Sequence, residues 1–451
     1  MADPHPPTDD SGFAQRNLKT VIVVALIALV CAAAYPWCKV WVQAADILLE
    51  SNGQIPPAPL RAALDPHVMA QSVTIRGTDG LTTHAILYTP AGDPRAAGMV
   101  IVHGLDPGGM QSVAGYSRLV ASTGLRVLTP DIPALREYNV AGSNASTVRR
   151  VGDSTTWLAH YTERPVTLMG ISFGGGLAMA AAGRPAYAKS IATVFDVGGY
   201  DDLTRVMNFY ITGEYAGPNR LPATERRSPW GDYLLEYTDL RMFGSPSQRA
   251  ALAPLLRAEV VNEAHHPKGQ KEKIAAMTAS LTPDQRKDWE QFLTGQDEAR
   301  FARLVTVLTP RMQEVSPHGH LEDLAAKVYI LHGLQDDVIP VGEARWLAHD
   351  VPAGHLKMMV LSPLVSHVHL HGEHATRWDK VRLLACMDAV HFAAIQPYSN
   401  PVFWLQFTYL AVLLAAAIAI GAAVGSGIER RQKIRHAMAA KRMARVPMTS
   451  A

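Results

Sequence analysis

The pentapeptide Gly-Ile-Ser-Phe-Gly, residues 170–174, fits the pattern G-x-S-x-G and places Ser172 between two glycines. It follows an apolar run typical of a buried strand and precedes a run of small residues typical of a helix. At such a junction glycines allow a tight, strained turn that lifts the serine hydroxyl above the end of a sheet. The pattern therefore predicts a nucleophile at Ser172, the alternative being a glycine-rich turn whose serine does no chemistry.

A serine hydroxyl is a weak nucleophile at neutral pH and needs a base that is itself held by an acid. On a sheet of this kind the acid and then the base follow the serine along the chain. Asp336, just beyond the apolar run 327–333 in the stretch HGLQDDVIP, is the expected acid. Its neighbour Asp337 and the earlier Asp196 are the alternatives.

Four histidines fall in the segment 365–374, VSHVHLHGEH, between the last predicted strand and the last predicted helix. His367 comes first after that strand and is the expected base, with His369 as its competitor. An extended loop would place His367, His369 and His371 on one face, which is the geometry that a metal site would use. Only Glu373 lies at ligand spacing beyond them, so we expect neither a metal nor another cofactor.

An acyl intermediate needs hydrogen-bond donors for the oxygen that becomes negatively charged. The backbone N–H of Phe173, next to the serine, would be one donor. The loop after the apolar run 98–104 would supply the other, and Leu105 is the residue we expect there. His103 in the same stretch is expected to make structural hydrogen bonds rather than to act as a second base.

These residues belong to a region that alternates apolar runs with helical stretches. A hairpin is expected around Gly80, and residues 203–323 are rich in charge and predict a largely helical insertion over one end of the sheet. Strand–helix alternation on either side of that insertion predicts an α/β fold with a doubly wound, mostly parallel sheet. The expected buried strands are residues 98–104, 126–133, 165–172, 190–199, 327–333 and 355–362.

The stretches VIVHGL, GISFGG and HGLQDDVIP, together with a histidine after the last strand, resemble the α/β-hydrolase superfamily. The resemblance covers roughly residues 70–395 and places the insertion where members carry a lid. It implies the α/β-hydrolase fold, a Ser–Asp–His triad and hydrolysis of an acyl bond, usually an ester. It does not identify the substrate, because one fold serves many activities.

Two apolar stretches flank this region, at residues 21–37 and 401–428. A helix needs about 20 apolar residues to cross a bilayer, so we expect both to be transmembrane. Buried core helices are the alternative for both. A cleaved secretion signal is a further alternative for the first, because residues 32–34 are small.

Basic residues favour one orientation of these spans. The N-terminal side of the second span has no cation nearer than Arg382, whereas its C-terminal side has many, and Arg16 and Lys19 precede the first span. By the positive-inside rule, both termini are expected in the cytoplasm and the middle region on the extracytoplasmic side of the cytoplasmic membrane. The basic residues after the second span are Arg430, Arg431, Lys433, Arg435, Lys441, Arg442 and Arg445.

The composition excludes some classes of protein. The net charge of +2 gives no sign of a nucleic-acid partner, and three cysteines supply neither a disulfide framework nor a zinc spacing. With 451 residues, the chain is long enough for several parts. We expect an N-terminal tail (1–19), a first span (20–42), a hydrolase core (65–202 and 324–396), a lid (203–323), a second span (401–428) and a basic cytoplasmic tail (429–451).

These features predict a membrane-anchored serine hydrolase that cleaves carboxylic esters, with small-molecule or lipid esters as substrates. Acyl lipids are included because tethering at both ends would hold a lidded site near the bilayer. The alternatives are a serine peptidase or thioesterase of the same fold, a metal-dependent hydrolase built on the histidines, and a catalytically silent binding module. An intact triad argues against silence. The sequence leaves the oligomeric state open.

Overall fold

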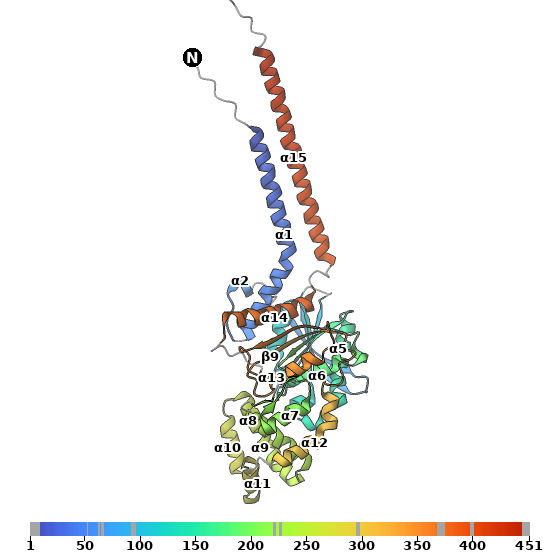
Figure 1. The fold of residues 1–451 in the computed structure, drawn as a ribbon, viewed down its shortest axis with the longest axis vertical. Coiled ribbons are helices and arrows are strands. Elements are labelled where there is room, and N and C mark those ends of the chain that lie inside the picture. Colours follow the sequence, from blue (N-terminus) through green and yellow to red (C-terminus); the bar gives the residue numbers. More distant parts are fainter. Residues whose placement is uncertain are drawn as a thin grey trace, which may run out of the picture. The chain divides into compact units, whose positions relative to one another are not determined.

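The computed structural model describes residues 10–443 apart from 52, 62, 63, 65, 66, 92–95, 220, 221, 225–227, 295–297, 368–374 and 397–400. The chain divides into two compact units. The larger unit is Val40–Ile395, and the smaller one combines Met1–Lys39 with Gln396–Ala451. Figure 1 shows the elements of both.

An eight-stranded sheet forms the centre of the larger unit, in the order β1-β2-β4-β3-β5-β6-β9-β10. Strand β2 pairs antiparallel with both β1 and β4, and all the other pairs are parallel. The predicted hairpin and the predicted mostly parallel sheet are therefore confirmed. The strands are β1 (Val68–Arg76), β2 (Thr82–Pro90), β3 (Gly98–Val102), β4 (Arg126–Pro130), β5 (Val166–Ile171), β6 (Ile191–Val197), β9 (Lys327–Gly333) and β10 (Leu356–Ser362).

Helices cover both faces of this sheet (Figure 1). Alternate residues of a strand point to opposite faces, so Leu168 of β5 joins one apolar core and Met169 joins the other. The first face packs against α5 (Ala145–Tyr161), α6 (Phe173–Ala182) and α13 (Val341–Asp350). The second face packs against α3 (Ala114–Ala121) and α14 (Arg377–Ile395). The apolar side chains between this face and these helices form the second core.

The segment between β6 and β9 is largely helical. Ser228 and Ser245 cap two of its helices through their side chains, and a proline follows each cap at the first helical position. A partly buried ion pair of 2.6 Å between Arg300 and Glu236 ties the last helix to an earlier one. The elements are α7 (Leu203–Thr212), β7 (Glu214–Tyr215), β8 (Ala223–Thr224), α8 (Pro229–Phe243), α9 (Pro246–His265), α10 (Gln270–Ala279), α11 (Pro283–Thr294) and α12 (Glu298–Val315).

Two long helices carry the apolar stretches at the ends of the chain, α1 (Asp10–Ser51) and α15 (Pro401–Met443). Each is long and apolar enough to cross a membrane, over Lys19–Ser51 and Trp404–Val424, and almost none of either apolar window is buried. The remaining short helices are α2 (Ala58–Arg61), η1 (Gly109–Gln111), α4 (Pro133–Arg136), η2 (Val140–Gly142) and η3 (Pro185–Tyr187).

Helix α1 continues past the expected end of the first span at residue 42. Its last residues belong to the larger unit, where Val40, Ala44 and Ile47 are buried. These positions are spaced as one face of a helix. Gln43 Nε2 donates a 3.0 Å hydrogen bond to the Thr123 carbonyl. The helix that begins in an apolar stretch therefore ends as part of the second core.

Candidate active site

Ser172 lies where β5 ends and α6 begins, as predicted. Its backbone has φ 55° and ψ −129°, a strained conformation for a residue with a side chain. The turn is held by a 2.8 Å hydrogen bond from the Ser172 N–H to the Val197 carbonyl. A Cβ at Gly174 would overlap the His103 carbonyl oxygen, so glycine is required for this close approach of backbones. The strain is local and presents the hydroxyl at the carboxyl end of the sheet.

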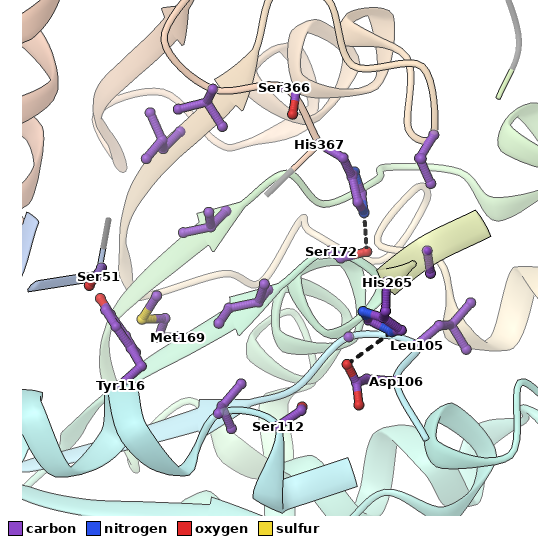
Figure 2. A pocket seen from close by; sticks show the side chains of 18 of the residues that line it. Ser51, Leu105, Asp106, Ser112, Tyr116, Met169, Ser172, His265, Ser366 and His367 are labelled. Atoms are coloured by element: carbon purple, nitrogen blue, oxygen red, sulfur yellow. Dashed lines mark hydrogen bonds and ion pairs between the residues drawn. The ribbon is translucent and has the colours of Figure 1, made fainter. Parts of the chain in front are cut away.

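A chain of hydrogen bonds links the predicted nucleophile, base and acid. Ser172 Oγ lies 2.7 Å from His367 Nε2 (Figure 2), and His367 Nδ1 lies 3.0 and 2.9 Å from Asp336 Oδ1 and Oδ2. A carboxylate accepts only, so Nδ1 carries the proton and Nε2 is free to accept one from the serine. The three residues come from the ends of β5, β9 and β10, which meet at one edge of the sheet.

Asp336 is fully buried, and its loop compensates for the lost hydration. The N–H groups of Val338 and Ile339 donate to Asp336 Oδ1 at 3.0 and 2.8 Å. His332 Nε2, also buried, donates to the Ile339 carbonyl at 2.8 Å and holds the same turn. Burial lowers the pKa of His332, so this histidine is a neutral donor at pH 7. The carboxylate is therefore fixed in the orientation that His367 requires.

The alternative acids lie elsewhere. Asp196 is buried at the end of β6. Burial raises its pKa to about 8, and the smaller effect of the Gly199 N–H lowers it. A group that is mostly neutral at pH 7 stabilises an imidazolium poorly. Asp337 follows Asp336 and accepts the Ser228 N–H through its backbone carbonyl at 3.3 Å. The structure therefore brings Asp336, and neither alternative, to His367.

His103 and the histidines after His367 are the other candidates that the sequence offered. His103 donates from Nδ1 to the Gly104 carbonyl at 2.8 Å and accepts the Ile132 N–H at Nε2 at 3.1 Å. Burial lowers its pKa, and these two bonds give it the structural role expected from the sequence. The candidate residues His369, His371, Glu373 and His374 lie outside the described residues.

The two expected oxyanion donors lie beside Ser172. Phe173 is the first residue of α6, so its N–H has no acceptor within the helix, and the helix dipole adds positive potential there. Leu105 follows β3, and a Cβ on its neighbour Gly104 would lie 3.5 Å from Ser172 Oγ. Among the described residues, neither N–H donates to a backbone carbonyl.

A cavity of about 1470 Å³ surrounds Ser172 and His367. Two of its walls were not anticipated from the sequence. His265, the last residue of α9, forms a 3.2 Å ion pair with Asp106 of the loop after β3 (Figure 2). Leu48 and Ser51 contribute the end of α1. No local pattern marks these residues, because the cavity joins segments far apart in the sequence.

A mostly parallel sheet covered by helices on both faces, with a Ser–His–Asp chain at the carboxyl ends of its strands, defines the α/β-hydrolase architecture. No family model matches the sequence, and no curated protein matches it. Solved structures similar to this chain include hydrolases, esterases and peptidases, at 11 to 19% identity.

One is a 2,6-dihydroxy-pseudo-oxynicotine hydrolase (15% identity, 75% of this chain and 71% of that one, TM-score 0.41). Another is a 2-hydroxy-6-oxo-6-phenylhexa-2,4-dienoate hydrolase from a Rhodococcus strain (19%, 73% and 100%, TM-score 0.40). A third is brefeldin A esterase, described as a bacterial homologue of human hormone-sensitive lipase (16%, 89% and 90%, TM-score 0.40). The activity of this chain therefore has to be argued from its own residues.

Proposed function

We propose that this chain is a serine hydrolase that cleaves carboxylic esters through an acyl-enzyme intermediate. The observation that supports it is the continuous hydrogen-bonded chain Ser172–His367–Asp336 at the wall of a large cavity. His367 Nε2 is unprotonated and can take the proton of the serine hydroxyl. Two N–H groups beside the serine can donate hydrogen bonds to the oxyanion.

The reaction follows from this arrangement. Ser172 Oγ attacks the ester carbonyl carbon while His367 Nε2 takes the hydroxyl proton, and Asp336 stabilises the imidazolium. The carbonyl oxygen becomes an anion facing the N–H groups of Leu105 and Phe173. The intermediate collapses as the C–O bond to the alcohol breaks and His367 gives that alcohol its proton. Water, deprotonated by the same histidine, then attacks the acyl carbonyl carbon. The bond from that carbon to Ser172 Oγ breaks, His367 returns the proton to Oγ, and the acid is released.

Membrane anchorage is the second part of the proposal. Helices α1 and α15 each contain a stretch suited to a bilayer, and almost none of either stretch is buried, unlike a core helix. The clustered cations after the second stretch favour cytoplasmic termini and an extracytoplasmic catalytic unit. Protease digestion of sealed spheroplasts tests this: the catalytic unit should be cleaved from outside while tags at both termini are protected. Loss of an N-terminal tag during export would instead indicate a cleaved signal.

A fluorophosphonate probe, which reacts with activated serines, tests the catalytic part. Wild-type membranes should label, and the Ser172→Ala and His367→Ala variants should not. Ser112→Ala is the matched control, because Ser112 lines the cavity but donates its hydroxyl to the Gly109 carbonyl. An unlabelled wild type, or labelling that survives Ser172→Ala, would refute the nucleophile.

Substrate class is tested with matched ester, thioester and amide substrates. We expect the ester to be hydrolysed fastest, whereas a faster amide or thioester would favour a peptidase or a thioesterase. Activity that EDTA removes and zinc restores would favour the metal-dependent alternative. Labelling without turnover of any of these substrates would favour a silent binding module.

A further inference from the structure

The cavity around Ser172 has two arms of different chemistry. One arm extends under the insertion and is lined by polar groups, among them Asp106, Glu263, His265 and Gln335. The other arm is lined mostly by apolar side chains, with the hydroxyl-bearing Ser51 and Tyr116 among them. Figure 2 shows Met169, Tyr116 and Ser51 on one side of Ser172, and Asp106 and His265 on the other.

The apolar arm runs along the second face of the sheet. Met169 and Ile171 precede the nucleophile on β5 and, being two residues apart, point to the same face. Phe195 of β6 and Leu331 of β9 continue this wall. All four belong to, or pack against, the core shared with α3 and α14. The arm thus begins beside the nucleophile, and strands of the central sheet form one of its walls.

Helices close the opposite side of this arm. Leu119 comes from α3, Leu383 and Met387 come from α14, and Leu48 comes from the end of α1. Leu48 also packs against the second core, where neighbouring Ile47 is buried. The helix that carries the first apolar stretch therefore supplies part of the substrate cavity.

Size and chemistry together indicate what the cavity accepts. Its volume of about 1470 Å³ exceeds the range of roughly 300–1,000 Å³ that is common for small-molecule sites. A polar substrate group gains no binding free energy from an apolar arm. Each substrate methylene that the arm removes from water instead tightens binding about fourfold, equivalent to roughly 0.8 kcal/mol. A polar arm on the other side suits the opposite half of an amphiphile.

We propose that the apolar arm binds a long aliphatic acyl chain, and that the substrate is an amphiphilic ester whose polar alcohol lies under the insertion. This inference rests on the proposed ester hydrolysis at Ser172. The acyl group becomes bonded to Ser172 in the first chemical step and stays so until the second, and the arm that starts at the nucleophile strand and has fixed core walls suits it. The alcohol leaves after the first step, from the arm covered by the insertion.

The experiment measures kcat/KM of the full-length, detergent-purified protein for p-nitrophenyl esters from butanoate to hexadecanoate. Met387→Trp and Leu48→Trp place bulk in the apolar arm at two partly buried positions on different helices. Val381→Trp on α14 and Leu49→Trp on α1 are the matched controls, because neither residue lines the cavity. Comparing each variant with wild type at each chain length cancels partitioning of the ester into detergent micelles.

We expect wild-type kcat/KM to rise by up to about fourfold per methylene until the arm is filled. Met387→Trp and Leu48→Trp should lower kcat/KM for dodecanoate by about tenfold or more, with butanoate and fluorophosphonate labelling within about threefold of wild type. The control variants should keep the wild-type profile.

Four results would overturn the inference. A flat wild-type profile, or tryptophan variants that lower all chain lengths equally, would do so while leaving ester hydrolysis intact. If kcat/KM rose with the alkyl chain length of acetate esters, and not with the acyl chain length, the aliphatic chain would belong to the alcohol. Wild-type protein that neither hydrolyses butanoate nor labels would overturn the proposed function itself, and the inference with it.

Discussion

Replacing Asp336 with asparagine tests the proposed proton arrangement at nearly constant shape. In the structure, Asp336 Oδ1 accepts the N–H groups of Val338 and Ile339, and Oδ2 lies 2.9 Å from His367 Nδ1. An amide nitrogen cannot accept those two donors, so the asparagine carbonyl must occupy the Oδ1 position. Its NH₂ group then occupies the Oδ2 position and faces His367.

This orientation reverses the tautomer of the base. The carbonyl at the Oδ1 position, 3.0 Å from His367 Nδ1, already accepts two backbone N–H groups, so the NH₂ group at the nearer position decides the tautomer. Nδ1 becomes the unprotonated acceptor of that NH₂ group, which moves the ring proton to Nε2. A protonated Nε2 cannot take the proton from Ser172, although the three side chains remain in place. In a serine protease the same replacement of the triad acid by its amide lowers kcat by about 10⁴, and we expect about the same loss here, equivalent to roughly 5.4 kcal/mol.

The assay is steady-state hydrolysis of p-nitrophenyl butanoate at pH 7, with thermal unfolding to show that the fold is intact. The neighbouring Asp337→Asn is the control, and it should retain kcat within about threefold because it leaves the bonds of Asp336 unchanged. An Asp336→Asn variant with kcat within about tenfold of wild type would refute the reasoning, since the base would then work in the wrong tautomer.

Three other predictions concern the surroundings of the triad. The raised pKa of Asp196, about 8 against an ordinary 3.8, means that the folded state keeps a proton that the unfolded state loses between these values. Wild-type stability should therefore fall as pH rises through this window, by up to about 1.4 kcal/mol per pH unit, and the melting-temperature advantage of Asp196→Asn should grow from pH 5 to 7. An advantage that does not change with pH would contradict this assignment. Gly104→Ala places a Cβ 3.0 Å from Ser172 Cβ and should lower kcat about 10- to 100-fold with little change in melting temperature, so an unchanged kcat would contradict the close approach. Asp106→Asn and His265→Ala each break a partly exposed ion pair beside Leu105, and each should cost at most about 1 kcal/mol of stability. Each should lower kcat a few-fold, and the double variant should be no worse than either alone; additive losses would show that the two residues act separately.

The sequence predicted the sheet and the triad geometry because their signals are local. A short apolar run marks a buried strand, and the glycines around Ser172 mark a turn that few other residues permit. Asp336 and His367 lie in the loops that follow two such runs, and parallel strands bring their carboxyl ends to one edge. Knowing the strand ends was therefore enough to place three side chains together.

The cavity walls could not be predicted in the same way. His265 comes from a segment whose charge pattern indicates helices but not how they pack, and its partner Asp106 lies in a loop. An ion pair between such distant positions depends on the fold of the whole insertion. Periodicity gives a helix its apolar face without saying which surface that face covers.

The sequence could not fix where the first apolar stretch stops for a different physical reason. Val40, Ala44 and Ile47 are apolar, and an apolar side chain suits a lipid bilayer and a protein core equally well, so composition cannot separate the two. Two polar residues do separate them: Gln43 and Asp46 are both buried in the larger unit. An amide and a carboxylate are costly in hydrocarbon unless protein partners surround them. Their position on α1 therefore marks a part of the helix that belongs to the larger unit, just before Leu48 reaches the cavity.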